Sequence, residues 1–166
     1  MRLTPVLAAL SLLGGCAQYP AKDNALQSEY YRAPRGMEQS AAYRSELLLR
    51  ALALVGVQYK FGGNSPATGF DCSGLVQYLF GQVLGLALPR SAQEMSRVGA
   101  EVGADELHLG DLVFFNTLRQ PFSHVGIYLG EQRFIHAPSS GGQVEIVNMT
   151  DRYWQRRYNG ARRISL

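Results

Sequence analysis

The pattern of hydrophobic and polar positions changes near residue 100, with a helical period before it and strand-like runs after it. Between residues 40 and 55 apolar side chains recur three and four positions apart, which predicts one face of a helix that Gly56 ends. That face consists of Tyr43, Leu47, Leu48, Ala51, Leu54 and Val55. Residues 57–70 are rich in Gly, Asn and Pro and are predicted to form a loop. The first part of the chain is therefore expected to be helical and to lead into a long loop.

Two further helices are predicted before residue 100. One runs from Asp71 to about Gly85, since an aspartate commonly caps a helix and a glycine commonly ends one. The other is short and opens at Ser91, where Ser91 and Glu94 have the spacing of a capping box.

Five short runs after residue 100 read as strands, because they are β-branched or aromatic and are separated by turn residues. The runs are residues 111–115, 124–129, 133–137, 144–147 and 160–165. Helices followed by strands indicate an α+β fold in which N-terminal helices pack on a C-terminal sheet.

Composition and charge limit the number of domains and the kinds of partner to be expected. The chain has 166 residues, 46% of them hydrophobic, which suits one compact domain. Its formal net charge of +3 is too modest to imply a nucleic-acid partner, whose binders concentrate basic residues on one face. The basic and aromatic residues between positions 152 and 163 are accordingly expected to form a solvated edge and a final strand.

The N-terminus has the features of an export signal. The mostly apolar residues 3–13 are too few for a bilayer span, which needs roughly 20 residues, but suit the core of a secretory signal. The following "LLGGC" resembles a bacterial lipoprotein signal, in which Cys16 is acylated and becomes the mature N-terminus. An ordinary signal peptide with an incidental cysteine is the alternative. Ala17, where an aspartate would favour the inner membrane, points to the outer membrane.

The chain is thus divided into a signal peptide (residues 1–15), a lipidated polar tether (16–40) and a folded domain (41–166). If Cys16 carries lipid, then Cys72, the second of two cysteines, has no disulfide partner. A Cys16–Cys72 disulfide is the alternative.

Cys72 stands where a reactive thiol is expected. With Asp71 as the N-cap it lies in the first helical turn, where unpaired N–H groups and the helix dipole lower a thiol pKa. The same N–H groups could stabilise an oxyanion. Gly74 leaves room for a neighbouring segment to approach the thiol.

Two histidines can serve this thiol. His124 opens one predicted strand and His136 closes the next, and a hairpin with a three-residue loop at 129–131 would set them opposite each other, with Cβ atoms about 5 Å apart. One ring could then take the thiol proton while the other orients it. The third histidine, His108, is expected in an exposed turn. A zinc site is a weaker alternative, because it would leave the helix-start position of the cysteine without a purpose.

Six ordered motifs carry a family resemblance. They are "YKFGG", "FDCSGLVQY", "LPRSAQEM", "LGDLVFF", "SHVGIYLG" and "FIHA". Together they resemble the papain-like NlpC-type cell-wall cysteine peptidases, from about residue 41 to the end of the chain. With the lipoprotein signal, the whole is similar to Spr-type murein endopeptidase lipoproteins. The resemblance implies a papain-like α+β fold with an antiparallel sheet.

The resemblance also implies roles for individual residues. The nucleophile falls on Cys72, the base on His124 and the third polar residue on His136. Tyr59 falls near the oxyanion. Substrate-side positions fall on Asp71, Ser73, Arg90 and Ser91.

The function so implied is hydrolysis of an amide bond in the stem peptides or cross-links of peptidoglycan. No metal or organic cofactor is needed, and the protein is expected to be a monomer, to bind no nucleic acid, and to face the periplasm from a lipid anchor in the outer membrane. Two alternatives remain: a non-catalytic wall-binding adaptor, and a thiol acyltransferase on the same fold.

Overall fold

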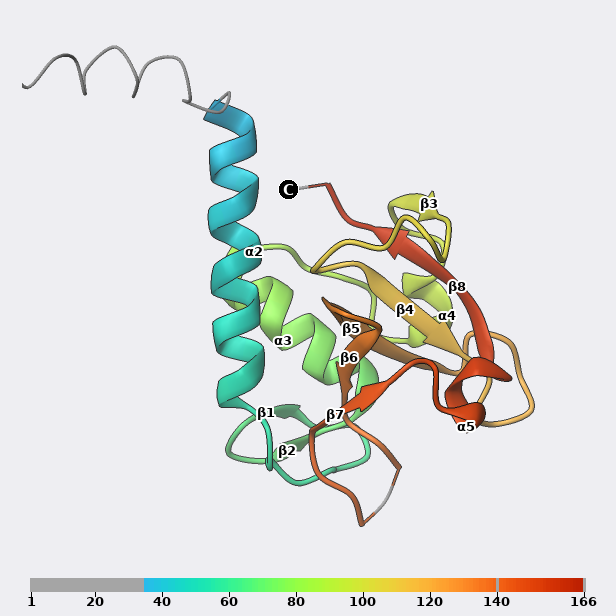
Figure 1. Ribbon diagram of the computed structural model, residues 1–166. Coiled ribbons are helices and arrows are strands. Elements are labelled where there is room, and N and C mark those ends of the chain that lie inside the picture. The colour runs from blue at the N-terminus through green and yellow to red at the C-terminus, as the bar shows by residue number, and fades with distance from the viewer. Residues whose placement is uncertain (1–34, 140, 166) are drawn as a thin grey trace, which may run out of the picture. The chain divides into compact units, whose positions relative to one another are not determined.

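The computed structural model describes residues 35–139 and 141–165, and in this part of the chain the helices precede most of the strands (Figure 1). The predicted signal peptide, Cys16 and the first part of the predicted tether lie outside the described residues. Within the described ranges no helix combines the length and the apolar character needed to cross a membrane.

The first described helix, α2 (Arg35–Ala53), begins before the start predicted near Ser40. It buries Leu47 and Ala51, and Leu54 is buried in the turn that follows, as the apolar period predicts. Val55 was expected on the same face but is 48% exposed, because the helix ends at Ala53 and the following turn directs the residue outward.

The other predicted helices are confirmed. Helix α3 (Cys72–Leu84) begins after its N-cap Asp71 and ends at Gly85, whose left-handed backbone (φ 65°) is the usual helix stop. Helix α4 (Ala92–Met95) begins after Ser91, which forms the predicted capping box with Glu94. A fourth, short helix, α5 (Arg152–Gln155), was not predicted.

Six antiparallel strands form the main sheet, in the order β3-β8-β4-β5-β6-β7. They are β3 (Ala100–Val102), β4 (Leu112–Phe115), β5 (His124–Gly130), β6 (Arg133–His136), β7 (Glu145–Asn148) and β8 (Tyr158–Arg163). A small separate hairpin pairs β1 (Asn64–Ser65) with β2 (Gly69–Phe70). The five predicted strands are all present. Strands β1, β2 and β3 were not predicted. The first two are two residues long and lie in the segment expected to be a loop, and the three residues of β3 show no run of apolar or β-branched side chains.

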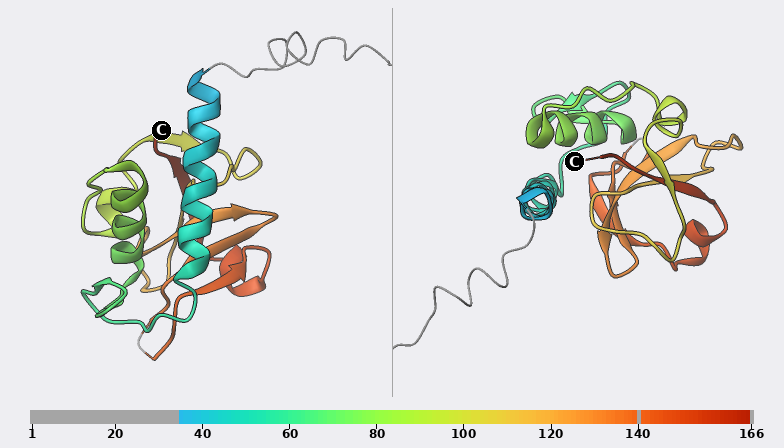
Figure 2. Two further views of the ribbon diagram at one scale, coloured as in Figure 1. Left: turned by 90° about the vertical axis from the view of Figure 1, so that its left-hand side faces the viewer. Right: turned by 90° about the horizontal axis from the view of Figure 1, so that it is seen from above.

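The sheet is covered on its two faces by different layers. Helix α3 lies against β5 and α2 packs on α3, so both helices are on the same side of the curled sheet (Figure 2). Leu75 and Leu79 of α3 share the main core with odd-numbered residues of β5 such as Ile127. This architecture confirms the predicted α+β fold with N-terminal helices on a C-terminal antiparallel sheet.

A second, smaller core occupies the opposite face of the sheet. It is rich in aromatic residues, with Phe115 of β4 and Phe134 of β6 stacked at 4.7 Å between ring centroids. Trp154 of α5 packs edge-on against both rings. Helix α5 thus closes this core next to the even-numbered positions of β5 and β6.

The β5–β6 hairpin has a different register from the predicted one. Tyr128 rather than Gly126 pairs with Phe134, so the strands are shifted by two residues from the prediction that set His124 opposite His136. The reason is the turn. Glu131 and Gln132 form a tight two-residue loop with positive φ, and an irregularity between Tyr128 and Gly130 absorbs the extra residue.

This correction leaves the two histidines on one face. Side chains alternate between faces with a period of two, so a shift of two residues moves a side chain along the strand without turning it over. His124 and His136 therefore still project from the same side of the sheet, beside the aromatic core.

Candidate active site

The backbone around Cys72 is held by a helix cap and a close loop. Asp71 has an extended backbone, and its Oδ1 accepts a 2.7 Å hydrogen bond from the N–H of Gly74. A Cβ atom at Gly74 would lie 2.0 Å from the carbonyl oxygen of Gly63. The absence of a side chain at Gly74 therefore allows the loop before β1 to close over the first turn of α3.

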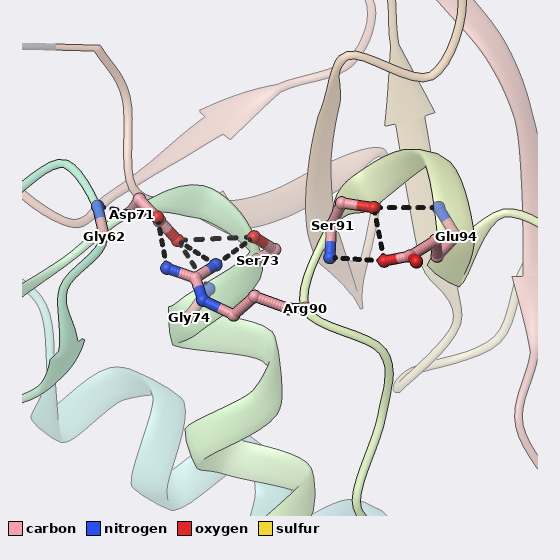
Figure 3. A network of polar contacts seen from close by, with 7 residues as sticks. All are labelled: Gly62, Asp71, Ser73, Gly74, Arg90, Ser91 and Glu94. Carbon is pink, nitrogen blue, oxygen red and sulfur yellow. Dashed lines mark hydrogen bonds and ion pairs between the residues drawn. The ribbon is translucent and has the colours of Figure 1, made fainter.

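Arg90 ties the cap to the segment that precedes α4 (Figure 3). Its guanidinium donates to both carboxylate oxygens of Asp71 and, at 2.7 Å, to the hydroxyl of Ser73. The N–H of Gly62 donates to the second oxygen of Asp71 at 2.9 Å. Burial alone would raise the pKa of Asp71, but the hydrogen bonds from Arg90, Gly74 and Gly62 outweigh it and hold that pKa below its usual value. Asp71 is therefore an ionised, fixed carboxylate.

Ser91 is engaged in its own helix cap. Its Oγ accepts from the N–H of Glu94 and donates to the carboxylate of Glu94 at 2.7 Å (Figure 3). The hydroxyl predicted to face substrate thus also holds the start of α4 in place.

The two histidines form a buried hydrogen-bonded pair. Nε2 of His124 lies 2.9 Å from Nδ1 of His136, and the side chains are almost entirely removed from solvent. Trp154 covers both imidazoles, with ring centroids 5.7 Å from His124 and 4.8 Å from His136. Because its Nε2 is paired, His124 has only Nδ1 left for another partner.

Burial keeps both rings uncharged. It lowers the pKa of His124 to about 4. Burial, together with the charge that His124 would carry, lowers the pKa of His136 to about 3. At neutral pH the two neutral imidazoles therefore share one hydrogen bond, in which one ring donates and the other accepts.

The predicted lowering of the Cys72 pKa is not what the structure shows. Burial of the thiol raises the Cys72 pKa, and the negative charge of Asp71 raises it further. The N–H groups of Val125, Ser73 and Cys72 itself lower it, but by less. The helix-start effect exists, but desolvation exceeds it, so the resting thiol keeps its proton.

A single cavity of about 660 Å³ brings the predicted site residues together. Those that line it are Tyr59, Asp71, Cys72, Ser73, Arg90, Ser91, His124 and His136. Exposed apolar side chains at its rim include Phe61 and Leu118. His108 does not line it and is exposed, as expected. A partly buried nucleophile candidate thus faces a space large enough for an extended peptide segment.

Among the cavity residues that the sequence did not predict, Trp154 and Glu145 lie next to the histidine pair. Trp154 was assigned to a solvated edge, but α5 turns it onto the histidine rings. Glu145 lies directly opposite His136 in the β6–β7 ladder and also lines the cavity. Both positions depend on long-range packing, and the local sequence carries no signal for them.

The candidate metal chemistry finds no support in the described part of the chain. Residues 35–139 and 141–165 hold no group of three or more His, Cys, Asp or Glu side chains arranged to bind a metal ion.

Comparison with known proteins gives consistent matches. Over 99% of its length the chain is 34% identical to murein DD-endopeptidase MepS/murein LD-carboxypeptidase of Escherichia coli strain K12, covering 92% of that protein. It is 46% identical to murein DD-endopeptidase MepH of the same strain over 66% of this chain, but spans only 42% of that longer relative.

The fold has solved counterparts as well. An NlpC/P60 family protein from Bacillus cereus superposes with a TM-score of 0.69 at 31% identity, over 74% of this chain and 40% of that one. The NlpC/P60 family model itself matches residues 56–163, which contain the cysteine, both histidines and the whole sheet. The chain therefore belongs to the NlpC/P60 family of cysteine peptidases.

Proposed function

We propose that the protein is a cysteine endopeptidase that hydrolyses amide bonds in the peptide part of peptidoglycan. One observation carries the proposal: a thiol at the start of α3 and a hydrogen-bonded histidine pair line the same cavity. The names of the two Escherichia coli relatives, both murein DD-endopeptidases, support peptidoglycan as the substrate.

The proposed reaction begins from neutral groups. Nδ1 of His124 takes the proton of the Cys72 thiol as the sulfur attacks the carbonyl carbon of the scissile amide. The carbonyl π electrons move to oxygen, and backbone N–H groups at residues 72 and 73 donate to the resulting oxyanion, with the hydroxyl of Tyr59 as a further donor. The C–N bond then breaks, the amine leaves with the proton from His124, and a thioester remains.

Water completes the cycle. His124 takes a proton from the attacking water, whose oxygen adds to the thioester carbon. The C–S bond breaks, the carboxylic acid product leaves, and the sulfur recovers the proton from His124. His136 holds the ring of His124 in place throughout, and the buried setting of both rings keeps the base uncharged until the transfer.

The substrate side of the cavity is formed by the polar cluster at the start of α3. Asp71 and Arg90 present a paired carboxylate and guanidinium, and the hydroxyl of Ser73 is hydrogen-bonded to both. Burial raises the pKa of Tyr59, and the negative charges of Asp71 and of Cys72 when it is ionised would raise it further, so the hydroxyl keeps its proton and can donate. Ser91 contributes by fixing the segment that carries Arg90.

We further propose that this domain, residues 41–166, is held at the outer membrane and faces the periplasm. The "LLGGC" sequence supports acylation of Cys16 after removal of residues 1–15, and Ala17 supports the outer membrane. Residues from 16 up to α2 would then serve as a tether. The domain would act as a monomer on the wall, without nucleic acid.

Digestion of purified sacculi tests this function. The soluble protein should release peptide fragments with new amino and carboxyl termini, and mass spectrometry of the fragments would show whether the cut lies in a cross-link or within one stem. Protein whose thiol has been alkylated with iodoacetamide is the control and should release nothing. Binding of sacculi without fragments would instead support an adaptor, and fragments capped by an added amine would support an acyltransferase.

A further inference from the structure

One nitrogen of the histidine pair is fully buried and has no hydrogen-bond partner among the described residues. Nε2 of His136 is fully buried, and among the described residues no donor or acceptor meets it at hydrogen-bond geometry. A buried polar atom left in this state is uncommon and destabilising. The nearest charged group is the carboxylate of Glu145, whose Oε1 is 3.5 Å away.

The strand pairing fixes this arrangement. Glu145 of β7 is the register partner of His136 of β6, so the two side chains project from neighbouring positions on the same face. Glu145 makes no other ion pair or side-chain hydrogen bond with the described residues, and its side chain is 53% exposed at the cavity. A small rotation about its side-chain bonds would bring the oxygen from 3.5 Å to hydrogen-bond distance of Nε2.

A carboxylate at this point determines where the protons of both rings lie. An ionised carboxylate can only accept hydrogen bonds, so Nε2 of His136 must carry the hydrogen. In the neutral ring, Nδ1 of His136 is then an acceptor. Nε2 of His124 donates to that acceptor across the 2.9 Å contact, which leaves Nδ1 of His124 with a free lone pair. In the opposite arrangement, His136 would donate from Nδ1, and Nδ1 of His124 would hold a proton and could not accept one.

We propose that Glu145 is a positioning residue that selects the base-competent tautomer of His124 through His136. The inference rests on the proposed function, in which Nδ1 of His124 takes the thiol proton. It extends the site from three residues to four, Cys72–His124–His136–Glu145, with the last acting only through hydrogen bonds. A peptide bound in the cavity would exclude water from the carboxylate and strengthen its bond to His136.

The tautomers can be read directly by nitrogen NMR. In the full chain carrying Cys16→Ser and labelled with ¹⁵N on histidine, long-range ¹H–¹⁵N spectra distinguish protonated from unprotonated ring nitrogens. The wild-type cavity should show both rings as the Nε2–H form. Glu145→Ala should populate the Nδ1–H form of His124 and lower kcat on muropeptides about tenfold at unchanged KM, as expected when a hydrogen bond that favours one tautomer is lost.

Two further variants separate this role from a general effect on the sheet. Glu145→Gln keeps an oxygen that can accept from His136 and should retain more activity than Glu145→Ala. Glu101→Ala removes an exposed carboxylate from the opposite edge strand, where it pairs with Arg162, and should behave as wild type.

The spectra and the rate of Glu145→Ala together decide whether Glu145 has this role. Unchanged ring-nitrogen signals in Glu145→Ala, or changed signals with kcat within twofold of wild type, would overturn the inference. If the wild-type protein hydrolyses no muropeptide, the proposed function fails, but the spectra of Glu145→Ala still decide whether Glu145 sets the tautomers.

Discussion

Lowering the pH from 7 to 5 is expected to destabilise the folded protein through its two buried histidines. The pKa of each ring is lowered from 6.5, to about 4 for His124 and about 3 for His136. Between these pKa values and pH 6.5, the two histidines bind protons in the unfolded chain but not in the folded chain. The free energy of unfolding therefore falls as the pH falls through this window.

The magnitude follows from the same pKa values. At pH 5 a free histidine is almost fully protonated while each buried ring remains neutral, so each contributes a loss of about 2 kcal/mol relative to pH 7. Together they remove about 4 kcal/mol, a large part of the roughly 5–15 kcal/mol that stabilises a typical domain. Asp71 contributes little here, because its folded-state pKa is lowered and the usual pKa of an aspartate is already about 3.9.

Urea unfolding of the Cys16→Ser chain at pH 7, 6 and 5 measures this loss. His136→Gln should remove about half of the pH dependence, because one of the two buried titrating rings is gone. His108→Gln, at an exposed position, should leave it unchanged. Stability that stays within 1 kcal/mol from pH 7 to pH 5 would refute the reasoning, because it would mean that the buried rings can be protonated at no cost.

Three other predictions concern the thiol, its helix and its base. Gly74→Ala should destabilise the fold by about 3 kcal/mol or more in thermal unfolding, since its Cβ would clash with a backbone carbonyl oxygen at 2.0 Å. The control is Gly81→Ala in the same helix, which should be neutral or stabilising, because the nearest atom to its Cβ would be 3.9 Å away. Alkylation of Cys72 by iodoacetamide should increase only in the alkaline range, because burial raises the thiol pKa; labelling that is already maximal at pH 7 would contradict this. His124→Ala should nearly abolish muropeptide hydrolysis, whereas His136→Ala should reduce it by less and His136→Asn by less again; equal losses in all three would show that orientation and proton transfer are not separable here.

Much of the fold is readable from the sequence because its signals are local. The limits of α3 follow from a capping aspartate and a stopping glycine, and the capping box of α4 follows from a serine and a glutamate three residues apart. The strands after residue 100 have enough β-branched and aromatic residues to be recognised. These features depend on side chains within a few positions of one another.

The hairpin register and the outer part of the site are not local. The two-residue turn uses Glu131 and Gln132 in left-handed conformations that neither residue favours, so the sequence gives no sign of it. Trp154 reaches the histidines only because α5 folds back on the sheet, and Glu145 meets His136 only through strand pairing. The histidine pair was nevertheless found, because an error of two residues preserves the face of a strand.

The raised pKa of Cys72 also depends on contacts between residues that are far apart in the sequence. Its position at a helix start is visible in the sequence, but the burial that outweighs this effect arises where the residue packs against the main core. In the proposed mechanism, attack would therefore depend on proton transfer to His124 and not on a preformed thiolate.

The rate at which Cys72→Ala hydrolyses a defined cross-linked muropeptide tests the central claim most directly. The substitution removes one sulfur atom at a helix start where alanine is well tolerated, so the thermal unfolding midpoint serves as the check on folding. The proposed thiol mechanism predicts a fall of about 10⁴-fold or more in kcat with the fold retained. A folded Cys72→Ala protein that keeps hydrolysis within tenfold of the wild-type rate would show that another group attacks the amide, and the assignment of Cys72 as the nucleophile would be wrong.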